Sequence, residues 1–190
     1  MEKSRLVKLI DLIGGGLAII CAIFYLVIAI TNICNLSTDT KFNIFVIIVF
    51  ILQVALIVGL TLFGIKAMIP FIKNKDRDHS LSLAISSFLT FETIYTLLGM
   101  CFYGFNTIFL LIFIFSVIAL VVGILGIFFN FEKTVKLVLN GGSFLLSIVT
   151  IIILLCYSSG ISLATGIFLL FMVFVALTSF ILEIAFNETK

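Results

Sequence analysis

The chain has 190 residues, of which 63% are hydrophobic and only 11% are charged. A soluble domain is about 45–50% apolar and about 25% charged, so this chain has more apolar side chains than a water-exposed fold of its length can bury. The formal net charge of +2 is too small to indicate nucleic-acid binding. Composition and charge therefore exclude a soluble globular protein and indicate that lipid is the solvent for most of the chain.

Long apolar runs follow one another along the chain, each close to or above the ~20 residues that a helix needs to cross a bilayer. The apolar residues are continuous rather than alternating, which predicts helices and not the strands of a barrel. The predicted helices cover residues 6–33, 42–72, 81–105, 107–131, 137–157 and 161–186. The fold class is therefore all-α: a polytopic membrane bundle of about six transmembrane helices that occupies residues 1–190 as one domain, with no soluble domain.

The connections between these runs are short, so we expect the helices to form three consecutive antiparallel hairpins. Loops rich in Lys and Arg stay in the cytoplasm. With the N-terminus inside, all but one of the 11 basic residues lie on the cytoplasmic side, the exception being Lys41. We therefore expect a multi-pass protein of the cell (plasma or inner) membrane with both termini cytoplasmic. The heavy use of isoleucine and phenylalanine, without Trp, resembles a low-GC bacterial composition.

Glu92 lies near the middle of the third predicted helix, where a charge costs at least ~2.5–3.5 kcal/mol. Burial at that depth favours the neutral carboxyl. Tyr95 and Thr96 follow at helical spacing on the same face, and Gln53 lies at similar depth in the second helix. We expect these four residues to form an intramembrane polar site with a hydrogen bond between Glu92 and Gln53. Two interpretations stay open: a site for protons, cations or a small solute, or a protonated Glu that holds helices together.

Charged residues also lie near the predicted cytoplasmic ends of three helices. Asp11 is on the first helix, Lys66 on the second and Glu183 on the last. They are candidates for an ionic cluster that closes the inner face. The alternative, which we favour, is that their charged groups reach the lipid headgroups and water independently.

Gly14, Ala18 and Ala22 form a stripe of small residues at every fourth position of the first helix. Such a stripe allows another helix to approach closely. We expect it to serve packing within the chain, with packing against a partner helix as the alternative.

Residue patterns that carry catalysis are missing. The sequence has no nucleotide-binding loop, serine-hydrolase elbow or zinc-protease motif, and Glu92 is its only deep carboxyl. Cys34, Cys101 and Cys156 lie near predicted outer helix ends without metal-binding spacing, and the single histidine, His79, lies in a loop. We therefore expect a protein that is not an enzyme, with no catalytic residue, metal site or cofactor.

Two functions fit this pattern. The sequence favours a non-enzymatic membrane subunit or accessory protein that acts through helix contacts with a partner membrane protein or a second copy. The alternative is a transport component, either a carrier or a substrate-binding subunit, that uses Glu92 for a small solute or for proton coupling. The expected partners are the lipid bilayer, a membrane protein and, in the second case, a small solute, but no nucleic acid.

Overall fold

The computed structural model describes residues 3–35, 43–75, 79–157 and 160–187. Within these ranges the chain forms long α-helices and no strand. The helices are α1 (Lys3–Asn35), α3 (Ile44–Ile72), α4 (Ser80–Tyr103), α5 (Thr107–Phe128), α6 (Lys133–Tyr157) and α7 (Ile161–Asn187). All 6 are long and apolar enough to cross a membrane, which confirms the prediction of an all-helical, multi-pass chain.

Side chains and backbone geometry at the helix ends explain where the helices start and stop. The side chains of Asn43 and Asn106 cap α3 and α5 by accepting hydrogen bonds from the backbone N–H two residues later, at 2.9 and 2.8 Å. Gly104 ends α4 with a φ of 87°, a conformation that glycine adopts without steric cost. The backbone at Phe129 is extended, so α5 stops at Phe128, short of the predicted residue 131.

The predicted start of α6 was set by hydropathy, but the backbone follows another rule there. α6 already begins at Lys133, although the apolar run that predicted it starts at residue 137. Polar residues at a helix end can face headgroups and water, so the helix extends beyond its apolar part. α3 ends at Ile72, as predicted, and continues through Lys66 and Pro70. Pro70 lies in the last turn, so any kink that it causes affects only the final residues of the helix.

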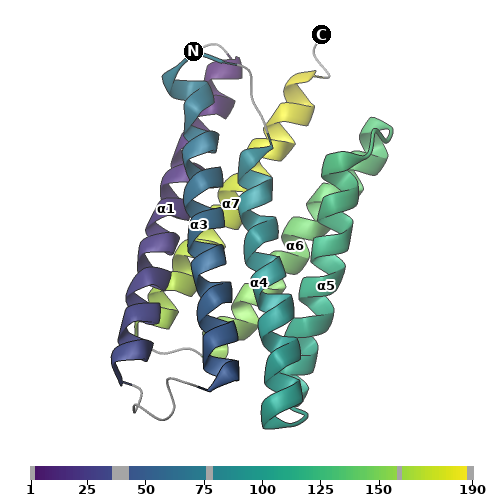
Figure 1. The fold of residues 1–190 in the computed structure, drawn as a ribbon. Coiled ribbons are helices and arrows are strands. Elements are labelled where there is room, and N and C mark those ends of the chain that lie inside the picture. Colours follow the sequence, from purple (N-terminus) through teal and green to yellow (C-terminus); the bar gives the residue numbers. More distant parts are fainter. Residues whose placement is uncertain (1–2, 36–42, 76–78, 158–159, 188–190) are drawn as a thin grey trace.

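The helices close into a ring. Each helix packs against the next one along the chain, α7 packs back against α1, and α4 also touches α1 and α7 across the interior. The start of α1 and the end of α7 lie at one end of the bundle, which we call the terminal end (Figure 1). The end of α1, the start of α3 and the end of α4 lie at the opposite, distal end (Figure 1).

The outer surface of the ring is apolar and its interior contains polar groups. Ile23, Leu62 and Val121 are each more than half exposed although they are aliphatic. In contrast, Glu92 and Thr150 are buried, at 4% and 0% exposure. This distribution is the reverse of a soluble protein and matches a bundle whose outer surface is solvated by lipid.

Candidate functional site

The helical repeat of α4 places Glu92 in the interior. Phe88, Glu92 and Thr96 are spaced four residues apart, and all three are buried. Residues at this spacing lie on one face of a helix. The buried face of α4 therefore carries an acidic side chain close to the middle of a 24-residue helix.

Glu92 lines a cavity of about 300 Å³ whose walls come from α1, α3, α4, α6 and α7. Of the other predicted polar site residues, Gln53 and Tyr95 line the same cavity, so the ring brings these three together. Further polar groups in its walls come from Asn32, Ser162 and Thr165. The remaining lining is mostly aliphatic and aromatic, as in sites that bind small molecules.

The carboxyl group of Glu92 is not fully satisfied. Its Oε2 oxygen is buried and has no hydrogen-bond partner among the described residues. The hydrogen bond that we expected from Gln53 therefore does not reach this oxygen, although both side chains face the cavity. A buried polar atom without a partner costs about 1–3 kcal/mol, so native structures rarely keep one without a reason.

Thr96, the fourth predicted site residue, does not line the cavity. Its hydroxyl donates to the backbone carbonyl of Glu92 at 2.7 Å, and the carbonyl of Thr93 lies 3.2 Å away. These contacts to the preceding turn satisfy the hydroxyl within α4. Thr96 therefore supports the helix beside the site and offers no group to a bound molecule.

Three aromatic rings border the cavity beside Glu92. Tyr25 of α1 meets Phe91 of α4 edge to face, with ring centroids 5.9 Å apart. Phe91 stacks on Tyr95 at a centroid distance of 5.7 Å and an interplanar angle of 13°. Sequence reasoning identified Tyr95 but not Tyr25 or Phe91, because only the contact between α1 and α4 brings them to the site. The sequence offered one signal: Tyr25 is the only tyrosine in the first predicted helix.

A second cavity of about 360 Å³ leads away from the site. It shares Asn32, Gln53 and Tyr95 with the first cavity and continues to Asn35 and Tyr103. Asn35 ends α1 and Tyr103 ends α4, and both helices finish at the distal end (Figure 1). The two neighbouring cavities therefore extend from the Glu92 region to residues at the distal end of the bundle.

Buried apolar side chains lie on the other side of Glu92. Phe88, Leu60 and Val173 are fully buried, each at 0% exposure. They come from α4, α3 and α7, and each lies closer along its helix to the terminal end than the cavity-lining residue of that helix. We call these three side chains the apolar layer. Along these three helices it lies between the cavity and the terminal end, within one buried hydrophobic cluster.

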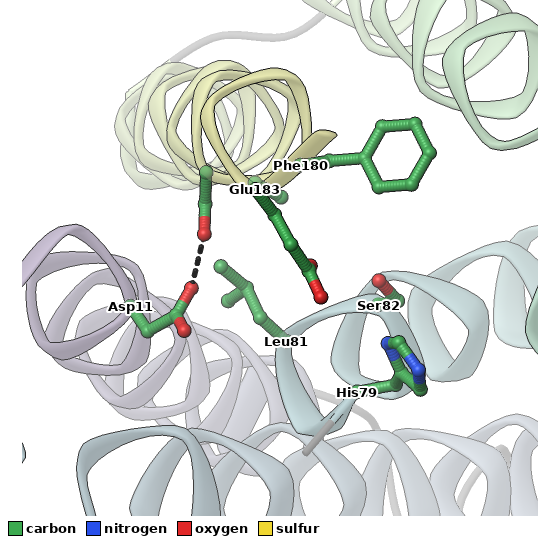
Figure 2. Close-up of a pocket in the computed structure, with 8 residues that line it drawn as sticks. Asp11, His79, Leu81, Ser82, Phe180 and Glu183 are labelled. Atoms are coloured by element: carbon green, nitrogen blue, oxygen red, sulfur yellow. Dashed lines mark hydrogen bonds between the residues drawn. The ribbon is translucent and has the colours of Figure 1, made fainter. Parts of the chain in front are cut away.

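The predicted ionic cluster is only partly assembled. Asp11 and Glu183 line one small pocket of about 20 Å³ near the terminal end, together with His79 (Figure 2). Asp11 is buried, and the hydroxyl of Ser179 donates to its Oδ1 at 2.5 Å (Figure 2). Lys66 is exposed on α3 and does not line this pocket. The structure thus brings the two carboxyl groups together without the lysine.

The small-residue stripe of α1 lies inside the bundle. Ala18 and Ala22 are buried at 0% and 2% exposure. A Cβ on Gly14 would come within 2.6 Å of Leu81 on α4, and the Cβ of Ala18 faces Gly64 on α3. The stripe is therefore covered by helices of the same chain.

The cysteines divide by location. Cys34, Cys101 and Cys156 are exposed near the ends of α1, α4 and α6, whereas Cys21 is buried.

No known protein family matches this sequence, and no curated protein or solved structure is significantly similar to it. Function therefore has to be inferred from the chemistry of the cavity.

Proposed function

We propose that this protein binds a small solute inside the bilayer, as a carrier or as the substrate-binding subunit of a larger transporter, and that Glu92 recognises the solute. One observation carries the proposal: Glu92 lines a cavity of about 300 Å³, and its buried Oε2 has no partner in the described chain. The sequence alone favours an accessory subunit, and the cavity reverses that order. The protein is proposed to be non-enzymatic.

The size and lining of the cavity support this function. Small-molecule sites measure about 300–1,000 Å³ and combine apolar walls with a few converging polar groups. The cavity reaches the lower end of this range, with Glu92, Gln53 and Asn32 as converging polar groups. A glutamate that only held helices together would be expected to use its carboxyl oxygens in hydrogen bonds across a packed seam. The unpaired Oε2 favours solute binding over this structural role.

We further propose an orientation and an access route. The topology is three antiparallel hairpins in a cell membrane, with the terminal end of the bundle in the cytoplasm, because basic residues concentrate there. In this orientation the second cavity, which reaches Asn35 and Tyr103, faces the outside. The apolar layer lies on the cytoplasmic side of Glu92. A solute would therefore enter from outside, as uptake requires.

An accessory subunit that contacts a partner membrane protein or a second copy is the second candidate. The small-residue stripe was its main support in the sequence. Because α3, α4 and α7 cover the stripe, such a partner would have to use another face of the bundle. The lipid-facing side chains of α5, such as Val121, are exposed and apolar and fit this requirement.

The proposal is tested by purifying the tagged full chain in mild detergent and identifying bound small molecules and proteins by mass spectrometry. Wild type is compared with Glu92→Gln, which keeps the side-chain shape but removes the charge. Glu132→Gln is the matched control, because Glu132 is exposed between α5 and α6, outside the cavity. We expect a small solute to copurify with wild type and the control and to be lost from Glu92→Gln, while all three elute as single species.

A different result would favour the second candidate. A stoichiometric membrane partner that is retained by Glu92→Gln, with no small solute in any sample, would refute solute binding. An ATP-hydrolysing membrane complex found together with a solute would instead identify the chain as the binding subunit of a transporter.

A further inference from the structure

We infer that the solute is an organic cation, an amine with an apolar body, whose ammonium group binds the Glu92 carboxylate between the rings of Tyr25, Phe91 and Tyr95. This inference rests on the proposed solute-binding function and adds the chemical class of the solute. It follows from three properties of the cavity: the sign of its charge, its aromatic side chains and its apolar walls.

The only formal charge available in the cavity walls is negative. Glu92 and the two tyrosines are the titratable residues among its described lining, which contains no Lys, Arg or His. An anionic solute would find no countercharge there and would be repelled by ionised Glu92. A cation would pair with the Glu92 carboxylate, whose Oε2 now has no partner. Opposite charges attract far more strongly in a low-dielectric interior than in water, which favours such a pair once the geometry allows hydrogen bonds.

The aromatic rings add a second feature that selects for cations. The faces of aromatic rings carry negative partial charge and attract ammonium groups that lie within about 6 Å of the ring centre. Neighbouring rings in the series Tyr25, Phe91 and Tyr95 have centroids 5.9 and 5.7 Å apart, and all three rings line the same cavity as Glu92. A carboxylate bordered by aromatic rings is a typical receptor for ammonium ions.

The rest of the cavity favours an amine over a divalent metal ion. A divalent metal ion takes six or more oxygen ligands, or several His and Cys ligands. Among the described residues, no three His, Cys, Asp or Glu side chains are close enough together to hold a metal ion. In contrast, Ile28, Val49 and Leu169 give the cavity apolar walls, against which the body of an organic cation can pack.

Binding of such a cation excludes a proton from the same oxygen. An ammonium group needs the ionised carboxylate, so a protonated Glu92 has to release its proton before the pair can form. The other titratable groups that face this site are Tyr25 from α1 and Tyr95 from α4. Because both are neutral phenols at physiological pH, the exchange involves one proton and one cation at Glu92.

The test uses three probes of similar shape, one positively charged, one neutral and one negatively charged. Phenethylammonium, 2-phenylethanol and phenylacetate are titrated by calorimetry into the purified full chain in lipid nanodiscs, with butylammonium as a smaller cation. We expect the two ammonium ions to bind, with phenethylammonium the tighter of the two, and phenylacetate not to bind. Binding of phenylethanol should be at least about tenfold weaker than that of phenethylammonium, because it lacks a charge-assisted hydrogen bond.

Two variants separate the charge from the rings. Glu92→Gln should weaken ammonium binding at least about tenfold and leave phenylethanol binding within about twofold of wild type. Phe91→Leu keeps an apolar side chain but removes one ring, and should weaken ammonium binding about threefold. Glu132→Gln should bind all probes like wild type. A structural role of Glu92 alone would not weaken the binding of one probe and leave the binding of another probe of the same shape unchanged.

The outcomes distinguish this inference from the proposed function. If phenylethanol binds as tightly as phenethylammonium, or neither ammonium ion binds, the inference of a cationic solute is overturned. Solute binding at Glu92 would still be supported if an endogenous neutral molecule copurified with wild type and was lost from Glu92→Gln. If no endogenous solute and no probe binds, both the inference and the proposed function fail.

Discussion

The contact between α1 and α3 gives the sharpest test of the helix arrangement. A Cβ added at Gly15 would lie 2.5 Å from the backbone oxygen of Gly64 and 2.8 Å from Cγ of Met68. An ordinary contact begins at 3.4 Å, so the two backbones would have to separate by roughly 0.9 Å, which is 3.4 minus 2.5. A backbone oxygen inside a helix cannot move aside by itself. We therefore expect Gly15→Ala to push α1 and α3 apart.

The neighbouring glycine supplies the matched control. A Cβ on Gly16 would meet nothing within 4 Å. Both changes gain the same helix propensity, about 0.5–1 kcal/mol, so this gain cancels in the comparison of the two variants. The difference that remains is the cost of overpacking, about 1–3 kcal/mol. Gly15→Ala should be less stable than Gly16→Ala by this amount.

The measurement is reversible unfolding in mixed micelles, with increasing SDS and detection by circular dichroism, because the chain has no Trp for fluorescence. Gly64→Ala should also destabilise, since its Cβ would lie 2.9 Å from the oxygen of Gly15. Equal stability of Gly15→Ala and Gly16→Ala would refute the close contact between α1 and α3. Loss of a copurifying partner without loss of stability would instead assign this face of α1 to another protein.

Three further predictions concern other parts of the molecule. Ser179→Ala removes the donor to buried Asp11 and should lower the free energy of unfolding by about 1–3 kcal/mol in the same assay. The double variant Ser179→Ala/Asp11→Asn should lose less free energy of unfolding than the two single variants lose in sum, because both changes remove the same hydrogen bond. A membrane-impermeant maleimide added to intact cells should label exposed Cys34 but not buried Cys21, and labelling of Cys34 only after lysis would reverse the proposed orientation. Because protons and ammonium ions compete for Glu92, amine affinity should fall as the pH falls, by about tenfold per unit where the carboxyl is mostly protonated, and a pH-independent affinity would contradict the competition.

The helices were predictable because lipid imposes one rule on every span. A segment in the hydrocarbon core has to satisfy its own backbone hydrogen bonds, so a long apolar run becomes a helix whatever its neighbours are. This is why the apolar runs matched helices α1 and α3 through α7. The ends were less predictable, because capping side chains such as Asn43 and polar turns such as the one that starts at Lys133 decide them locally.

Part of the site was also predictable, for a related reason. A polar residue in an apolar helix stands out in sequence, and depth alone grouped Glu92 with Gln53. Contacts between distant helices left no such signal. Ser179 lies 168 residues from Asp11 and meets it because α7 returns to α1 and closes the ring. Lys66, assigned to the same cluster by its depth, lies on another side of its helix, and hydropathy carries no information about that rotation.

The apolar layer leads to different expectations for the two kinds of transport component. A carrier has to expose its site to both sides of the membrane in turn, so Phe88, Leu60 and Val173 would have to part during each cycle. These side chains are fully buried, and opening the layer would expose or repack their apolar surface. A binding subunit needs no such opening within its own chain, because its partner supplies the movement. A carrier that is open to one side is closed on the other, so replacement of Val173 by Ala distinguishes the two: it should ease flux through a carrier, whereas a subunit that only binds should carry no flux by itself and keep its solute affinity.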